Sequence, residues 1–360
     1  MRPAFAAAVA QIREACPWDP DPVVAVADGE GRLLSASDGR GVASLESVAR
    51  FVRRSFAADW GPGSAAVSND PFVGAADICE MTLVSAVPDG LALARVRVPD
   101  LGGFDFGGVA PGALDVWGEG ARFPALRIAI DAGQRAEGRA LLRLNSRTPR
   151  LLDRALDALG EAAACGAEVL GERSALESER LEAAAAASAA LGALRPGTYA
   201  AEVEIDVPGQ PPGPAVRAAL TVGEEIELSF SESDPAVERP LNSTAPLTTD
   251  CSLAEIESGV AGFRAAPGAL EAISVDAGAG TIAGAELPAT TSLARFLTEG
   301  AIRAAVQDVL RQAGGAERTT TWWEAEGSQA FAQLIDPADL RLRAERVAWL
   351  VELEQGDDDD

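Results

Sequence analysis

The sequence contains no histidine and no lysine, so all 30 of its basic residues are arginines. A phosphate-binding P-loop needs its lysine, and Schiff-base catalysis needs a lysine amine, so neither is available to this chain. Without imidazole, Ser-His-Asp and Cys-His nucleophile systems are excluded, and the usual nitrogen ligands of zinc are missing. Carboxylates, thiols, hydroxyls, arginine and the backbone remain, and a metal site built from carboxylates alone would favour hard ions such as Mg, Ca or Mn.

Cysteines are few and widely spaced: Cys16, Cys79, Cys165 and Cys251 form no CxxC pair. A disulfide framework or a structural zinc site is therefore not expected, and a reducing cytoplasm is the simplest compartment. The chain has no run of about 18 apolar residues, so we expect no transmembrane helix and no membrane partner. Its N-terminal segment contains Glu14 and helical spacing, which predicts a first helix and not a signal peptide.

The chain has 55 aspartates and glutamates against 30 arginines, which gives a formal net charge of -25. An acidic surface repels phosphate, so we expect no nucleic-acid partner. Hydrophobic residues make up 48% of the chain and charged residues 24%, so a globular core is expected. The four aspartates at 357–360 are predicted to be a solvated acidic tail.

The periodicity of apolar residues predicts an α+β fold in three parts. Residues 1–149 form a mixed N-terminal region, 150–195 a helical middle, and 196–356 an antiparallel β region with a C-terminal helix. The expected elements are a first helix containing Phe5, Val9 and Ile12, a hairpin at 23–26 and 33–34, a helix from near Ser44, strands at 65–68, 81–87, 91–98 and 126–130, helices within 148–194, a meander at 199–231, a helix at 292–312, and a strand or helix at 340–353.

Residues 68–108 are the stretch in which we expect any active site. Among glycines and prolines, this stretch carries the carboxylates Asp70, Asp77, Glu80, Asp100 and Asp105. Its two predicted strands are joined by a Pro-Asp-Gly turn. Side chains alternate along a strand, so Arg95 and Arg97 are expected on one face of the second strand.

Six stretches match known sequence elements in a fixed order: 23–37, 62–83, 96–103, 110–128, 144–173 and 221–243. The second, PGSAAVSNDPFVGAADICEMTL, resembles a signature in which Asn-Asp-Pro-aromatic precedes Gly-Gly-Thr-His-Leu-Pro-Asp. The third, VRVPDLGG, resembles a His-His-x-Asp-Ile-Gly-Gly element. In this order, the six stretches resemble the hydantoinase B family, which includes the B half of 5-oxoprolinases and the alpha subunit of acetone carboxylases. The similarity covers residues 23–253 and continues more weakly to 312.

The resemblance implies a cytoplasmic hetero-oligomer in which residues 1–149 are the hydantoinase B-like region. A hydantoinase A-type partner would bind ATP and activate a cyclic amide or a ketone, and the B-type subunit would complete hydrolysis or carboxylation. ATP would thus be used only through the partner. Family members are longer, and their Gly-rich C-terminal portion is expected to be absent or eroded here, with Thr290-Thr291-Ser292 as a reduced remnant of one element.

The positions that would hold the family's metal depart from its pattern. Two histidines and an aspartate are taken to be its ligands, and they fall here at Asp77, Glu80 and Arg97 (or Val98). Both histidines are therefore replaced. The retained residues, to which we assign structural roles, are Asn69, Asp70, Gly102 and Gly103, and Asp100 is retained as well.

The sequence leaves two interpretations of this cluster open. In the first, Asp77, Glu80 and Asp100 are a catalytic carboxylate site, with a divalent metal (Mn, Mg or Zn) on Asp77 and Glu80 or with no metal. In the second, they belong to an ordinary acidic loop. We hypothesise that Arg97 replaces the lost cation by bidentate bonds to a carboxylate, although a surface position beside Arg95 is the plainer interpretation.

The functional prediction has two matching forms. The chain is either a subunit of an ATP-dependent cyclic-amide hydrolase or related carboxylase with a degenerate metal site, or a non-catalytic assembly or regulatory subunit that keeps the fold. A free-standing small-molecule binding module is a third possibility. Trp322, Trp323 and Trp349 are expected either at an interface or in the core.

Overall fold

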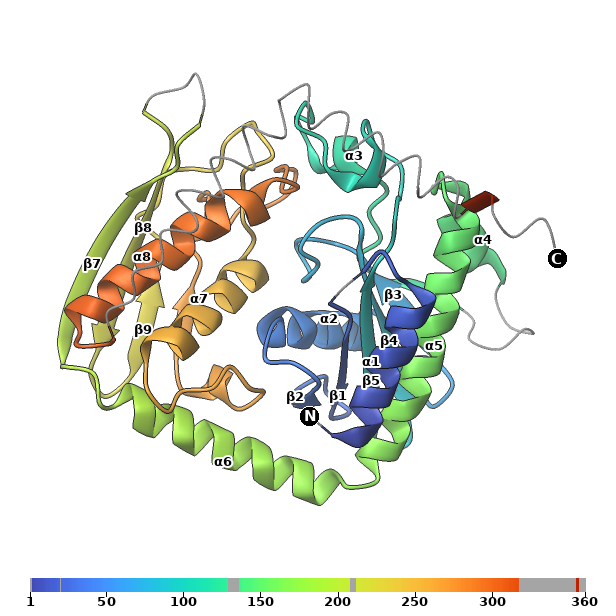
Figure 1. Cartoon of the computed structure of the whole chain (residues 1–360), viewed down its shortest axis with the longest axis horizontal. Helices are drawn as coiled ribbons and strands as arrows, with labels where there is room; N and C mark the ends of the chain where they lie inside the picture. The colour runs from blue at the N-terminus through green and yellow to red at the C-terminus, as the bar shows by residue number, and fades with distance from the viewer. Residues whose placement is uncertain (1, 20, 129–135, 208–211, 317–353, 356–360) are drawn as a thin grey trace. The chain divides into compact units, whose positions relative to one another are not determined.

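The computed structural model describes residues 2–19, 21–128, 136–207, 212–316 and 354–355 (Figure 1). Four expectations concern residues outside these ranges: the end of the strand at 126–130, the three tryptophans Trp322, Trp323 and Trp349, the element at 340–353, and the acidic tail. The fold is α+β, as the sequence predicts. Two compact units form, one from the described parts of Met1–Val109, Trp117–Arg180 and Val347–Asp360, the other from those of Ala110–Val116 and Leu181–Arg346.

The first unit is built on a six-stranded antiparallel sheet with the strand order β2-β1-β5-β4-β3-β6. Its central strands are buried along almost their whole length, which fits the many Val, Leu and Ala residues that they contain. The strands are β1 (Val23–Ala27), β2 (Leu33–Ala36), β3 (Ala65–Ser68), β4 (Glu80–Val87), β5 (Gly90–Arg97) and β6 (Leu126–Ile128).

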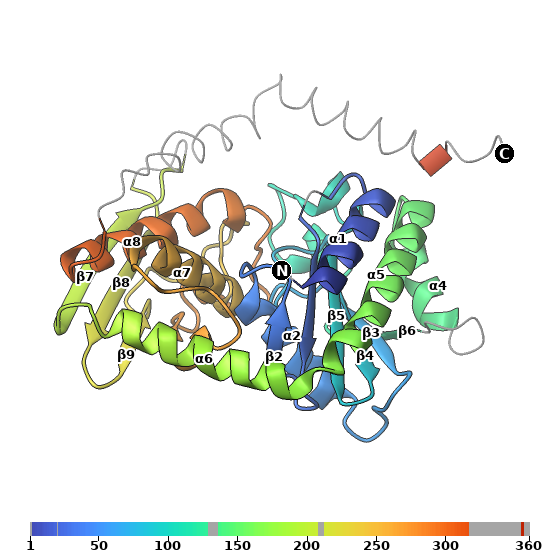
Figure 2. The ribbon, with the colours of Figure 1, turned by 60° about the horizontal axis from the view of Figure 1, so that its bottom comes forward.

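Helices cover both faces of this sheet, with α1 and α5 side by side on one face and α2 on the other (Figures 1 and 2). Gly166 lets α5 approach so closely that a Cβ there would lie 2.6 Å from the Cβ of Ala92. Ser44 of α2 bonds Arg95, which points to the opposite face from Ala92. The elements are α1 (Pro3–Ala15), α2 (Val42–Ser55), η1 (Phe106–Gly108), α3 (Val116–Glu119), α4 (Ala136–Leu144), α5 (Pro149–Leu170) and α6 (Arg173–Leu191), of which α3 and α6 have residues in both units.

The second unit is built on a four-stranded sheet with the order β10-β9-β8-β7. Three strands form the predicted antiparallel meander, and β10 joins β9 in parallel. Helix α8 packs on β7 and β8, and α7 packs on α8. The elements are β7 (Gly197–Glu204), β8 (Ala215–Val222), β9 (Ile226–Ser229), α7 (Ala245–Gly259), η2 (Ala269–Glu271), β10 (Ser274–Asp276), η3 (Ala294–Phe296) and α8 (Thr298–Gln312).

Most predicted elements are present, and two of the differences have clear reasons. The first helix, the hairpins and the meander form as expected. The helix predicted at 292–312 begins only at Thr298, because residues 294–296 form a separate 3-10 turn. Helix α7 was not predicted: buried hydroxyls of Thr248 and Ser252 interrupt any apolar stripe, and both bond backbone carbonyls. No helix in the described part of the chain is long and apolar enough to span a membrane.

Candidate functional site

The predicted site lies where β4 begins and β5 ends. These strands are antiparallel neighbours, and their register places Glu80 opposite Arg97. Asp77 lies in the loop that leads into β4, so the structure brings Asp77, Glu80 and Arg97 together at one end of a hairpin. Asp100 follows β5 and bonds a different arginine, Arg147.

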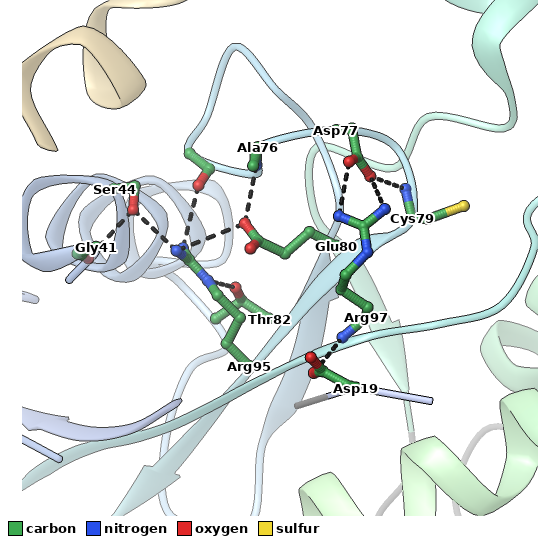
Figure 3. Close-up of polar contacts among 11 residues, drawn as sticks. Asp19, Gly41, Ser44, Ala76, Asp77, Cys79, Glu80, Thr82, Arg95 and Arg97 are labelled. Atoms are coloured by element: carbon green, nitrogen blue, oxygen red, sulfur yellow. Dashed lines mark hydrogen bonds and ion pairs between the residues drawn. The ribbon is translucent and has the colours of Figure 1, made fainter. Parts of the chain in front are cut away.

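Arg97 binds both carboxylate oxygens of Asp77 (Figure 3). Its Nη1 donates to Oδ2 at 2.7 Å and its Nη2 to Oδ1 at 3.0 Å. The backbone N–H of Cys79 also donates to Oδ1, at 2.9 Å. The Asp77 side chain has no solvent exposure and that of Arg97 has 22%. This is a two-bond, charge-assisted pair in a largely dry setting, the geometry in which arginine binds carboxylate best.

The charge of Arg97 is stabilised by its partner. Burial by itself would lower the pKa of Arg97, but the Asp77 carboxylate outweighs burial, so this pKa is raised above its ordinary value. The opposite holds for the neighbouring thiol: burial, reinforced by the charge of Asp77, raises the pKa of Cys79. Cys79 is therefore held as a neutral thiol and is unsuited to nucleophilic attack.

The backbone of Arg97 is anchored as well. Its N–H donates to Asp19 Oδ2 at 2.8 Å, and its carbonyl oxygen accepts a bond from the Trp18 indole at 2.9 Å. Val98, the other position matched to the second histidine, is a buried residue whose side chain alternates to the opposite face. Of the two positions, Arg97 is thus the one that reaches Asp77.

Glu80 lies beside another arginine, Arg95, which is buried (Figure 3). One Glu80 oxygen accepts the N–H of Ala76 at 2.8 Å and lies 3.6 Å from Arg95 Nη1. Arg95 is only 6% exposed. All its donor nitrogens have partners, since it also bonds Thr82 Oγ1, Ser44 Oγ and the Gly74 carbonyl, at 2.8, 2.8 and 3.1 Å. Arg95 therefore joins β4, β5, α2 and the loop before β4.

Asp100 is held by Arg147 from the residues just before α5. Arg147 Nε donates to Oδ2 at 3.1 Å and Nη2 to Oδ1 at 2.8 Å. The backbone N–H groups of Gly102, Gly107 and Arg147 also donate to this carboxylate, which is completely buried. Gly102 and Gly103 have φ values of 77° and 86°, which glycine adopts without strain. Asp100 is thus the centre around which the loop at 101–108 folds.

Asp70 and Asn69 organise the turn after β3. Asp70 Oδ1 accepts the N–H of Phe72 at 3.0 Å, and Oδ2 lies 2.8 Å from Nη2 of Arg122. The amide of Asn69 bonds the carbonyls of Ile78 and Ala121 and accepts the N–H of Phe123. Both side chains are fully buried. They tie the loop before β4 to the segment that leads into β6.

Four carboxylates of the predicted stretch thus have four arginine neighbours. The sequence points only to Arg97 as a partner for a carboxylate, and the structure adds three more arginines in that role: Arg95, Arg122 and Arg147. A usable signal was present, because Arg122 and Arg147 lie inside the fourth and fifth matched stretches. The fifth carboxylate, Asp105, is exposed on the loop surface.

The donor set does not fit the divalent metal that the resemblance implies. Both oxygens of Asp77 already accept guanidinium N–H groups, and arginine cannot act as a ligand. Asp100 is enclosed by Arg147 and backbone N–H groups. Within the described ranges, no three side chains of His, Cys, Asp or Glu are grouped so that they could hold a metal ion. The arrangement instead holds buried negative charge with fixed positive charge.

Solved structures share the fold at low sequence identity. One is an ATP-dependent caprolactamase from Pseudomonas jessenii, with a TM-score of 0.78 and 21% identity over 86% of this chain. Another is an acetone carboxylase in a nucleotide-free structure, with a TM-score of 0.69 and 15% identity over 86% of this chain. The match spans 58% of the caprolactamase chain and 46% of the acetone carboxylase chain, less than two thirds of either.

No curated protein sequence matches this chain. A sequence model of hydantoinase B/oxoprolinase matches residues 19–334, which include both strands of the site hairpin and most of the two units. The chain therefore belongs to the hydantoinase B/oxoprolinase family.

Proposed function

We propose that this chain is a B-type subunit that keeps the family fold without metal-dependent chemistry at the predicted site. In this role it is a non-catalytic assembly or regulatory subunit of an ATP-dependent cyclic-amide hydrolase, or of a related carboxylase. The observation that carries the proposal is the two-bond ion pair of Arg97 with Asp77. A guanidinium fills the coordination sites of the carboxylate at the position matched to the family's first histidine.

The physical argument is one of charge balance. Buried carboxylates need compensating positive charge, because an unpaired buried charge costs several kcal/mol. At the metal-ligand positions a metal would supply that charge, whereas here Arg97 supplies it to Asp77. Replacement of a metal ion by an arginine can keep the local fold. The Lewis acid and the free ligand positions are then lost.

The same geometry argues against proton transfer by Asp77 and Asp100. A general base must reach the proton that it abstracts, in a suitable substrate pose. Asp77 and Asp100 are completely buried and accept hydrogen bonds from arginine and backbone N–H groups. Either could act on a substrate only after the hairpin or the loop at 101–108 had opened.

The ATP-dependent part of the proposal rests on relatives and on composition. The similar caprolactamase and the acetone carboxylase are described as ATP-dependent. This chain has no lysine for a P-loop, which agrees with ATP being bound by a partner, a hydantoinase A-type subunit. The substrate of the whole complex would be a cyclic amide or a ketone.

Co-expression with a hydantoinase A-type subunit tests the proposal. We expect a stable complex whose ATP hydrolysis, assayed with hydantoin, 5-oxoproline, caprolactam and acetone, is unchanged by the paired substitution Asp77→Asn with Arg97→Met. That pair removes both charges together and leaves neither buried alone. Asp157→Asn, at an exposed ion pair, is the matched control. Loss of turnover in the paired variant, with the complex intact, would show that the site is catalytic and would overturn the proposal.

A further inference from the structure

Two large aromatic side chains are exposed, one on the loop at 101–108 and the other on α3. Phe104 is 72% exposed and Trp117 is 56% exposed. Isolated exposed apolar residues are ordinary, but aromatic residues are the ones that most often anchor protein interfaces. We call these two side chains the aromatic surface.

The backbones that carry the aromatic surface are packed directly together. The N–H of Phe104 donates to the carbonyl of Gly118, next to Trp117, at 2.8 Å. A Cβ on Gly103 would lie only 2.4 Å from the Glu119 carbonyl oxygen, so the loop and α3 touch through backbone atoms. The two side chains therefore start from adjacent points on one support.

Arg147 holds the loop at 101–108 in place. Besides holding Asp100, its Nη2 donates to the carbonyls of Gly102 and Asp105 at 2.8 and 2.9 Å, on either side of Phe104. Its guanidinium also lies 5.5 Å from the ring centre of Phe106. A loop fixed in this way loses little conformational entropy when it binds, which is what an interface anchor requires.

The negative charge at and around the aromatic surface favours a partner with basic residues. Asp105 is exposed next to Phe104 and forms no ion pair among the described residues. The whole chain carries a net charge of -25, so a second copy would bring like charge to the same place. A protein with an apolar pocket bordered by lysine or arginine would complement both the rings and the carboxylate.

We propose that Phe104 and Trp117 dock this chain onto its A-type subunit, through an apolar pocket with a basic rim. The inference rests on the proposed function for the identity of the partner, and on the loop geometry for the place of contact. It gives the Asp100–Arg147 pair a present role, because that pair holds the docking loop in shape.

Binding of the purified full chain to an immobilised A-type subunit tests this. We expect Phe104→Ala and Trp117→Ala each to weaken binding by about tenfold or more, as for an interface anchor. Asp105→Arg should weaken binding too, mainly through slower association that depends on salt. Leu181→Ala, which truncates a side chain that is 58% exposed on α6, is the matched control and should leave binding unchanged. The aromatic side chains are exposed, so melting temperatures should show that all four variants fold.

Each alternative outcome overturns the inference in a recognisable way. If the wild-type chain binds and both aromatic variants bind equally well, the docking surface is wrong and the proposed function stands. If the wild-type chain does not bind an A-type subunit at all, the proposed function fails and the inference fails with it. If the chain alone forms dimers that Trp117→Ala dissociates, in sedimentation experiments without partner, the occupant is a second copy of this chain.

Discussion

Arg97 and Asp77 are joined by two hydrogen bonds, 2.7 and 3.0 Å long, in which a completely buried carboxylate meets a guanidinium. The pair links the last residue of β5 to the loop before β4. It therefore closes the end of the hairpin at which the family's metal ligands are expected. The stability of this hairpin should depend on the pair remaining intact.

The first prediction concerns the loss of one partner. Arg97→Met should destabilise the chain by about 3–5 kcal/mol, because it leaves the Asp77 carboxylate buried and unpaired. Adding Asp77→Asn to that variant should restore much of the loss, since no isolated charge then remains. Urea unfolding of the wild type, both single variants and the double variant gives the coupling energy.

An exposed ion pair on α8 provides the control for this cycle. Arg311 and Asp308 form a 2.6 Å contact with 52% and 44% of their side chains exposed. Arg311→Met should cost no more than about 1 kcal/mol, as is usual for surface pairs. Equal costs for Arg97→Met and Arg311→Met would contradict the role given to Asp77.

The second prediction concerns metal. Dialysis against EDTA should leave the melting temperature unchanged, because the oxygens of Asp77 are already bound by Arg97 and need no cation. Elemental analysis after exposure to Mn, Mg or Zn and desalting should find no stoichiometric ion. A retained ion, together with a fall in melting temperature after EDTA, would show that the carboxylates do bind metal.

The sequence predicted local structure at this site well, because that structure depends on local rules. Alternation placed Arg95 and Arg97 on one face of β5, and the turn residues joined β4 to β5. The prediction that Asp77, Glu80 and Arg97 meet came from the family resemblance together with this hairpin. Periodicity by itself does not say which side chains at the ends of two strands form an ion pair.

Contacts between distant segments could not be predicted from the sequence. Arg147 binds Asp100 from 47 residues away, and nothing in the spacing of either residue points to the other. Arg122 and Asp70 are a similar pair, from segments before β6 and after β3. Such pairs follow from how the segments pack around the sheet, which one sequence without an alignment does not reveal.

The third prediction concerns pH. Burial, the largest influence, raises the pKa of Asp19 above its ordinary value of 3.8, although N–H groups of Arg97 and Asp21 act in the opposite direction. The folded chain therefore keeps this proton to a higher pH than the unfolded chain does. Folding takes up a proton in that window, so this carboxyl's contribution to stability falls as pH rises from 3.8 through the folded-state pKa.

Asp19→Asn removes this titration and keeps an oxygen that can accept the N–H of Arg97. Relative to the wild type, the variant should become more stable as pH rises from about 4 to about 7. Urea unfolding of both proteins at the two pH values measures the change in the free-energy difference. A difference that stays constant, or that moves in favour of the wild type, would contradict the raised pKa.

The fourth prediction concerns the close approach of Gly103 to α3. Gly103 has a φ of +86° and a Cβ there would meet the Glu119 carbonyl oxygen at 2.4 Å, whereas Gly63 has a φ of +89° with nothing within 4 Å of its Cβ position. Gly63→Ala should cost about 1–2 kcal/mol for backbone strain alone. Gly103→Ala should cost roughly 3 kcal/mol or more, because backbone atoms must also move apart. Thermal and urea unfolding compare the two variants, and equal costs would mean that the loop yields easily. A larger cost at Gly103 would show that the backbone contact carrying Phe104 is stiff, which is the property that makes this loop suited to binding.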